Sequence, residues 1–258
     1  PWYVATSDNA YDVALDGTHA YVASYIDGVA IVDITTPSSP GTPVYANPSG
    51  HARGVAVSGG YAFVASGASG LAIVDVTNPE APGSISYVDL GTHYADRVEI
   101  VGSFAYVAAE GVLAIIDVSD PENPGEPMYV AMNNATDVAV VDEIAYIVDA
   151  FEGLAVVDVS GPETAASATY VPTRSSPYDV SILGDYAYVA DYTQGVSIID
   201  MSDPHAPGTP VAVPDIGLAY QVAAAGSYLY VGAAAAGVKI VDISDPTMPA
   251  FEAEVDTH

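Results

Sequence analysis

The residues of this chain best suited to chemistry are a few basic side chains that share one place in a repeated pattern. Arg53, Arg97 and Arg174 each lie shortly before the first expected strand of a repeat unit, and His51 and His93 lie beside the first two arginines. A guanidinium group can hold a carboxylate, sulfate or phosphate through two parallel hydrogen bonds. An imidazole can act as a general base near neutral pH. These five side chains define a candidate ligand site on one face of the molecule.

Acidic and amide side chains next to these positions allow a second interpretation. The neighbouring residues with polar side chains are Asp12, Asp96, Asp137, Asp179 and Gln221. The arginines either bind an anionic ligand or neutralise these carboxylates with ion pairs at the mouth of a central channel, and the sequence leaves both options open. The separation of the repeat units argues against a metal site or acid–base pair that joins the two histidines to Asp96 or Asp137, so we expect no metal site.

A second set of aspartates recurs at a nearly constant interval along the chain and is expected to be structural. Each ends a pentapeptide such as Leu71–Asp75, and the set is Asp33, Asp75, Asp117, Asp158, Asp200 and Asp242. Ser or Thr follows each aspartate at the second position. Because an aspartate at a strand end accepts hydrogen bonds from nearby backbone N–H groups, this pattern predicts a turn rather than a catalytic or metal-binding residue.

The same interval divides the chain into six units, each expected to form four short strands. In the second unit these are Gly54–Val57, Tyr61–Ala65, Leu71–Val76 and Ile85–Val88. The segments are rich in Val, Ile, Tyr and Ala without a helical period, so we expect no helix of note. The second and third strands are apolar on both faces, which requires both faces of each sheet to be buried. The pattern predicts an all-β, six-bladed β-propeller with four antiparallel strands per blade.

Both ends of the chain match the fourth strand of a unit. Phe251–Val255 fits the sixth unit, and Trp2–Thr6 lies one full repeat ahead of Val44–Pro48. We expect the N-terminal strand to join the last blade and close the ring, which leaves the residues after Pro249 peripheral. A longer array of repeats cut at both ends is the alternative. We treat residues 1–258 as one domain, a fragment of a longer surface or secreted protein, and expect the isolated domain to be monomeric.

These repeated segments resemble the LVIVD-repeat family of β-propellers. The resemblance rests on the pentapeptide, on the Ala-Tyr-Val-Ala segment upstream of it and on the Asp-Val-Ser-Asp-Pro segment that overlaps its end, and it covers all six units. Members of the family are mostly bacterial and archaeal surface or secreted proteins without an assigned activity. The resemblance therefore implies a propeller fold and an extracellular or cell-surface location, but no particular chemistry.

Charge and composition exclude several classes of protein. The 258 residues include 33 acidic and 4 basic side chains, a formal net charge of −29, and no cysteine. Too few basic residues are present to build a phosphate-binding surface, so we expect no nucleic-acid partner. Anionic membranes would repel the chain, and we expect no membrane insertion. A disulfide scaffold is excluded.

The excess of acid also predicts a salty environment. At about 1 M salt the Debye length falls to roughly 3 Å, which screens the repulsion among the carboxylates. We therefore expect a protein adapted to high salt. Surface carboxylates could bind Ca²⁺, but the chain has no Asp-x-Asp-x-Asp-Gly loop, so we expect no cofactor.

Three functional hypotheses follow. The leading one is a non-enzymatic scaffold that binds a protein or a glycan. The alternative is a hydrolase or lyase acting on an anionic carbohydrate at the channel mouth, with the three arginines holding carboxylates and a histidine as base. The third is a structural spacer without a ligand. The chain has no Gly-x-Ser-x-Gly or His-Glu-x-x-His motif, which favours the non-enzymatic hypotheses. Unpaired Arg and His around a pocket would favour the enzyme, whereas Arg–Asp pairs would favour the scaffold.

Overall fold

The computed structural model describes residues 4–6, 8–165 and 167–256, and these form six four-stranded sheets in which paired strands run antiparallel. The chain divides into two compact units, Pro1–Tyr129 and Val130–His258. This arrangement confirms the predicted all-β class and the four strands per repeat.

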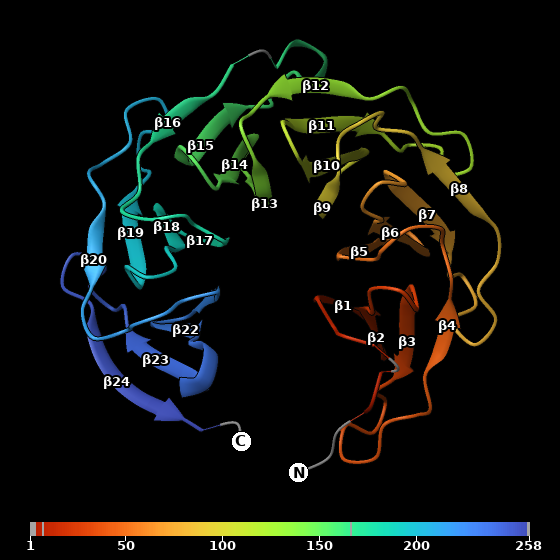
Figure 1. Ribbon diagram of the computed structural model, residues 1–258, viewed down its shortest axis with the longest axis horizontal. Coiled ribbons are helices and arrows are strands. Elements are labelled where there is room, and N and C mark those ends of the chain that lie inside the picture. The colour runs from red at the N-terminus through yellow and green to blue at the C-terminus, as the bar shows by residue number, and fades with distance from the viewer. Residues whose placement is uncertain (1–3, 7, 166, 257–258) are drawn as a thin grey trace. The chain divides into compact units, whose positions relative to one another are not determined.

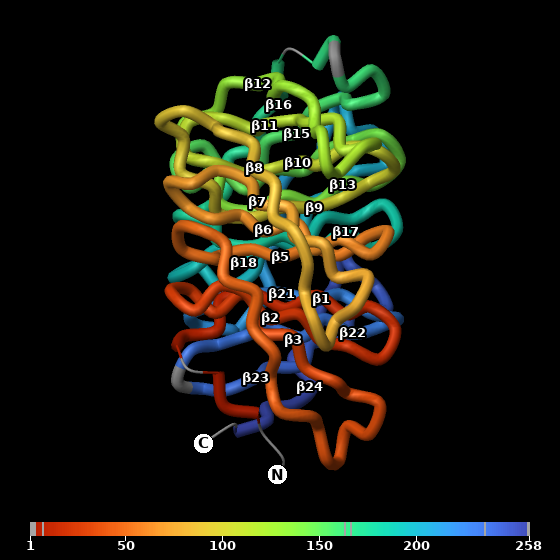
Figure 2. The backbone as a smooth tube through the Cα atoms, turned by 90° about the vertical axis from the view of Figure 1, so that its right-hand side faces the viewer, coloured from red at the N-terminus to blue at the C-terminus, as the bar shows by residue number. Residues whose placement is uncertain are grey.

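The first unit contains the strands of the first three sheets. The first sheet has the order β1 (Asp12–Asp16), β2 (His19–Ala23), β3 (Val29–Asp33) and β4 (Val44–Ala46). The second has β5 (Gly54–Ser58), β6 (Tyr61–Ala65), β7 (Leu71–Asp75) and β8 (Ile85–Val88), which Figure 2 shows following one another in order. The third has β9 (Ala95–Val101), β10 (Phe104–Ala109), β11 (Val112–Asp117) and β12 (Met128–Ala131), and the boundary between the units falls within β12.

The second unit contains the other three sheets. The fourth sheet has β13 (Ala135–Val141), β14 (Ile144–Asp149), β15 (Gly153–Asp158) and β16 (Thr169–Val171). The fifth has β17 (Asp179–Leu183), β18 (Tyr186–Ala190), β19 (Val196–Asp200) and β20 (Val211–Val213). The sixth has β21 (Gln221–Ala225), β22 (Tyr228–Gly232), β23 (Val238–Asp242) and β24 (Ala250–Val255). In the described residues, the helical elements are the single 3₁₀ turns η1 (Pro162–Thr164) and η2 (Ala234–Ala236). No helix in that part of the chain has the length and apolar content needed to cross a bilayer.

A glycine opens the third strand of several sheets for a steric reason. Gly28 and Gly70 have φ values of +73° and +75°, and a Cβ on either would lie 2.3 Å from a carbonyl oxygen of the fourth strand. Glycine alone combines the positive φ with this close approach. In the first and second sheets, the turn between the second and third strands is therefore encoded by a local glycine.

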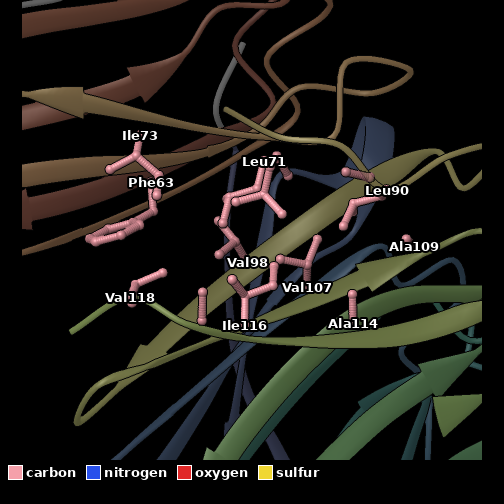
Figure 3. Packing of buried hydrophobic residues seen from close by; sticks show 14 of the residues in the cluster. Phe63, Leu71, Ile73, Leu90, Val98, Val107, Ala109, Ala114, Ile116 and Val118 are labelled. Atoms are coloured by element: carbon pink, nitrogen blue, oxygen red, sulfur yellow. The ribbon is translucent and has the colours of Figure 1, made fainter. Parts of the chain in front are cut away.

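The sheets pack face to face through apolar side chains. Figure 3 shows side chains of the second sheet, such as Phe63 and Leu71, directed into the same layer as Val98 and Ile116 of the third. A similar cluster joins the first and second sheets. Within each unit the first strands of consecutive sheets are neighbours, β1 beside β5 and β17 beside β21 (Figure 1). In the second sheet, packing on both faces leaves β6 and β7 almost entirely buried, as their composition predicts. In the sixth sheet β22 alternates buried and exposed residues, so the prediction does not hold there.

The expected role of the N-terminal strand is wrong. The sixth sheet takes its fourth strand from β24, which pairs with β23, so the segment after Pro249 is part of the sheet rather than peripheral. Trp2 and Tyr3 lie outside the described residues, and Val4–Thr6 is not in a strand. The C-terminal segment is adjacent in sequence to β23 and reaches it through a short turn, which involves less loop closure than recruiting the far end of the chain.

Candidate functional site

The predicted site residues lie at the start of the first strand in each sheet. In the first unit, these starts bring Arg53, Arg97 and Asp96 together. Arg53 precedes β5, whereas Asp96 and Arg97 are the second and third residues of β9. β5 and β9 are neighbouring strands. The sequence predicted that both arginines precede a first strand, which holds for Arg53, whereas Arg97 lies within β9. The packing of the sheets brings these residues into contact.

Arg53 forms an ion pair with Asp96 through Nε and Oδ1. The two atoms are in close contact, although they are not oriented as a linear hydrogen bond. The guanidinium carbon of Arg53 also lies 5.2 Å from the ring centre of Tyr11 and 5.6 Å from that of Tyr94. The charge of Arg53 is thus compensated by a carboxylate and covered by two aromatic faces, an arrangement that stabilises a partly desolvated cation.

Asp96 is well covered, with 16% of its side chain exposed. Burial raises the pKa of its carboxyl group, while the neighbouring Arg53 and Arg97 act in the opposite direction. Desolvation, which penalises the charged form of the carboxyl group, outweighs the stabilisation of that form by the two arginines. Loss of Arg53 would therefore raise the pKa of Asp96 further and leave its carboxylate without its ion-pair partner.

The guanidinium group of Arg97 donates hydrogen bonds to backbone carbonyl oxygens of the protein. Nη1 donates hydrogen bonds to the carbonyl oxygens of Arg53, at 2.7 Å, and Asp96, at 3.2 Å, and Nη2 donates to that of Tyr11, at 3.2 Å. Its side chain therefore ties together the starts of the first three sheets. Gly54 fits beside it because a Cβ there would lie 2.8 Å from the Cα of Arg97.

His51 and His93 are engaged by different neighbours in the described part of the chain. The ring of His51 stacks on Tyr25 at 4.3 Å between centres, and its Nδ1 lies 3.3 Å from the hydroxyl of Tyr94. Nδ1 of His93 lies 2.7 Å from the carbonyl oxygen of Glu110, and its ring packs against Tyr129. The packing thus supports each imidazole separately rather than presenting them as a pair.

Three of the predicted acidic residues connect neighbouring sheets. Asp12, Asp137 and Asp179 each accept a hydrogen bond from the N–H of the first-strand valine in the following sheet. The acceptor distances are 2.9 Å for Val55, 2.9 Å for Val180 and 2.7 Å for Val222. A carboxylate that satisfies a backbone donor across a sheet junction serves assembly.

The remaining two predicted residues lie in the second unit. Arg174 is exposed, and its backbone N–H donates to Oδ2 of Asp191, a fully buried carboxylate. Gln221 is exposed at the start of β21. Arg53 and Arg97 belong to the first unit, so each unit contributes its own candidate residues.

Tyr178, Tyr192 and Tyr220 form a cluster in the second unit, outside the candidate site residues named from the sequence. The missed signal is that Tyr11, Tyr178 and Tyr220 all lie two residues before the first-strand valine of their sheets. The sequence also missed Tyr11 as the ring under Arg53.

The structural role of the repeated aspartates is confirmed. Asp33 accepts from the N–H of Thr35 at 2.7 Å, and Asp117 accepts from that of Ser119 at 2.9 Å. The same bond occurs at Asp75, Asp158, Asp200 and Asp242. The hydroxyl and N–H groups of Thr35 lower the pKa of Asp33. Among the described residues, no group of three or more His, Asp or Glu side chains is arranged to hold a metal ion.

Comparison with known proteins agrees with this repeat structure. The LVIVD repeat profile matches residues 3–43, 49–89, 93–131, 133–166, 176–211 and 216–257. The chain belongs to the LVIVD repeat family. No curated protein matches this family member.

Solved structures with little sequence identity share the fold of this LVIVD repeat protein. U3-55K is 10% identical with a TM-score of 0.77, over 98% of this chain and 83% of that one. A functionally unknown protein from Desulfotomaculum acetoxidans is 12% identical with a TM-score of 0.76, over 98% and 87%. The computationally designed Ika8 protein is 12% identical with a TM-score of 0.73, over 96% and 74%. A further match consists of WD40 repeats, which form propellers. The LVIVD repeat protein is thus a six-bladed β-propeller.

Proposed function

We propose that this LVIVD repeat protein is a non-enzymatic scaffold that binds a protein or glycan partner through the loops preceding the first strands. The observation that carries the proposal is the ion pair between Arg53 and Asp96, covered by Tyr11 and Tyr94. A catalytic arginine needs its guanidinium free for substrate, whereas this one is used within the chain. The sequence criterion that Arg–Asp pairs favour a scaffold is met in the first unit.

The enzymatic alternative has less support from the same residues. A hydrolase or lyase would need a basic imidazole directed at a substrate held by arginines. His51 stacks on Tyr25, His93 contacts the carbonyl of Glu110, and Arg97 donates to three carbonyl oxygens. These contacts suit side chains that shape the loops for recognition.

The proposal extends to the environment. A surface with a net charge of −29 on 258 residues is suited to high salt, because salt screens the repulsion among carboxylates. We propose that the protein works outside the cell or at its surface, in a salty medium. Raising KCl from about 0.1 M to about 2 M is expected to raise the melting temperature, and a falling melting temperature would contradict the salt adaptation.

A thermal-shift screen followed by an activity assay tests the function. The protein is screened in about 2 M KCl, conditions that screen its charge, against acidic and neutral oligosaccharides, basic and acidic peptides, and Ca²⁺. A ligand at 100 times its Kd stabilises the folded state by about 2.7 kcal/mol. Binding without new reducing ends or unsaturated sugars supports the scaffold. Turnover of a bound oligosaccharide that is lost in His51→Gln or His93→Gln would overturn it in favour of the enzyme.

A further inference from the structure

Three tyrosines from separate loops of the second unit form one cluster, the tyrosine triad Tyr178, Tyr192 and Tyr220. Tyr178 precedes β17, Tyr192 lies between β18 and β19, and Tyr220 precedes β21. The ring centres are 5.4 Å apart for Tyr178 and Tyr192, 5.5 Å for Tyr178 and Tyr220, and 5.4 Å for Tyr192 and Tyr220. Each loop thus contributes one ring to a single aromatic surface.

The tyrosine triad is not part of the hydrophobic core. Tyr178 is 44% exposed and Tyr220 is 38% exposed, whereas Tyr188 of the neighbouring strand β18 is 1% exposed. The neighbouring side chain of Tyr192 raises the pKa of Tyr220. The triad therefore combines aromatic area open to solvent with hydroxyl groups, as sites that bind partly polar ligands do.

The backbone holds the tyrosine triad in place. Tyr192 has a φ of +44°, a conformation that costs energy for a residue with a Cβ. Its carbonyl oxygen accepts hydrogen bonds from Ala219, at 3.0 Å, and Gly195, at 3.1 Å. Because the bridge to Ala219 also fixes the loop that carries Tyr220, two of the three rings are preorganised before any ligand binds.

A polar loop lies against the same turn. The N–H groups of Arg174 and Ser175 donate to the buried carboxylate of Asp191, the residue before Tyr192, at 2.8 Å and 2.9 Å. The hydroxyls of Ser175 and Thr193 are 3.0 Å apart. Arg174 is exposed at this loop. Arg174 and Ser175 thus lie within four residues of Tyr178 in the sequence, and Thr193 directly follows Tyr192.

Arg174 differs from the other basic residues in how its charge is used. Arg53 pairs with Asp96, and Arg97 donates to carbonyl oxygens. Lys239 lies 3.8 Å from Glu254 and over the ring of Phe251. An exposed guanidinium in a chain with 33 acidic residues is the group best suited to attract a carboxylate from outside.

We propose that the tyrosine triad and Arg174 form a binding site for a short oligosaccharide that bears carboxylates, which rests on the glycan branch of the proposed function. The apolar C–H face of a pyranose stacks on a tyrosine ring, and a sugar carboxylate pairs with the Arg174 guanidinium. The hydroxyls of Ser175 and Thr193 hydrogen-bond to ring hydroxyls of the sugar. Three rings whose centres lie 5.4–5.5 Å apart can contact only a few sugar residues, so the ligand is short.

Isothermal titration with tetragalacturonate in about 2 M KCl, a salt level that screens the overall repulsion, tests the proposal. The comparison ligand is the same tetrasaccharide with its carboxylates reduced. Tyr220→Ala and Tyr178→Ala are expected to weaken binding at least about tenfold, as loss of a central aromatic contact does. Tyr220→Phe keeps the ring and is expected to retain binding. Arg174→Gln is expected to remove the preference for the acidic ligand over the reduced one.

The matched control is Tyr228→Ala, which removes a tyrosine of similar exposure, 41%, from the opposite end of the first hairpin of the sixth sheet. It is expected to leave binding unchanged, and melting temperatures show that each variant folds. Absence of tetragalacturonate binding, or binding unchanged in Tyr220→Ala and Arg174→Gln, would overturn the site. In the second case the glycan-binding function stands and its site lies elsewhere. A protein partner recognised in place of any glycan would overturn the site while the scaffold function stands.

Discussion

Two clusters at the same repeat position show how one scaffold can use its loops differently. Tyr11, Tyr25 and Arg53 of the first unit occupy the repeat positions that Tyr178, Tyr192 and Tyr220 hold in the second. In the first unit Arg53 sits over the ring of Tyr11 and pairs with Asp96. In the second unit Tyr220 replaces the cation and packs against two other tyrosines.

The two clusters differ in whether their charged and aromatic groups are paired within the protein. The first unit brings a carboxylate from the third sheet to a cation from the second, so charge and aromatic faces are matched internally. The tyrosine triad carries no charge and leaves 38% of Tyr220 and 44% of Tyr178 exposed. A cluster whose groups are paired within the protein stabilises the fold, whereas an exposed aromatic surface is available to a partner.

Arg53→Tyr is expected to have the largest effect, because it copies the second unit's residue into the first and leaves Asp96 without its cation. Breaking a buried pair typically costs about 3–5 kcal/mol, and the partial exposure of Arg53, 31%, reduces the expected loss to about 2–3 kcal/mol. Urea unfolding at pH 7 measures it. Arg53→Tyr combined with Asp96→Asn is expected to recover part of the loss, since the stranded charge is removed. A loss below about 0.5 kcal/mol would mean that the pair behaves as an exposed one.

Asp179→Ala is expected to cost about 1–2 kcal/mol, because the N–H of Val222 would lose its acceptor across the junction of the fifth and sixth sheets. Glu252→Ala, an exposed acidic residue of β24, is the control and should change stability little. Introducing the same aspartate in the first unit by Gly54→Asp is expected to destabilise, since the new Cβ would lie 2.8 Å from the Cα of Arg97. If Asp179→Ala leaves the free energy of unfolding unchanged, water replaces the carboxylate as the acceptor for the N–H of Val222.

Tyr220→Ala is expected to change stability by about 1 kcal/mol or less, the loss of aromatic contacts that are partly solvated. Chemical unfolding next to Arg53→Tyr makes the comparison direct. A loss equal to that of Arg53→Tyr would mean that the tyrosine triad supports the fold as strongly as the charged cluster does, and would contradict the division of roles between the two units.

Thr77→Val is expected to have the smallest effect on stability, and this effect should be seen only at acidic pH. The Thr77 hydroxyl is the largest cause that lowers the pKa of Asp75. A lowered folded-state pKa contributes stability above the unfolded value, near about 3.9, which is lost as pH falls through the folded value. Thr77→Val should therefore flatten the loss of stability in acid, measured by urea midpoints between pH 7 and about 2.5 in high salt. An unchanged pH profile would show that the backbone N–H of Thr77 suffices.

Asp96 should titrate with the opposite sign. Burial raises its pKa in the folded protein, so its contribution to stability is present below the unfolded value and is lost as pH rises through the folded value. Asp96→Asn is expected to remove this contribution in the wild-type background, and the urea midpoints of the two proteins should diverge above about pH 4. Parallel profiles would show that Arg53 fully offsets the burial of the carboxyl group.

The sequence alone determined the repeated features of this protein. The nearly constant interval between equivalent aspartates predicted the six sheets, and the predicted strand limits of the second sheet agree within one residue. The roles of Asp33 and its equivalents were also predictable, because each accepts a hydrogen bond from a residue two positions later. Interactions of this short range recur whenever the local pattern recurs.

Tertiary structure alone decided which residues meet across sheets. Arg53 and Asp96 come from different repeats, and nothing local selects that pair over another arginine and aspartate. The replacement of the N-terminal segment by β24 and the meeting of Tyr220 with Tyr178 likewise depend on how sheets pack. Contacts between neighbouring sheets are set by packing geometry, which a pattern of residue types does not specify. The fold was therefore readable from the repeat, whereas the candidate binding site was defined only by the assembled sheets.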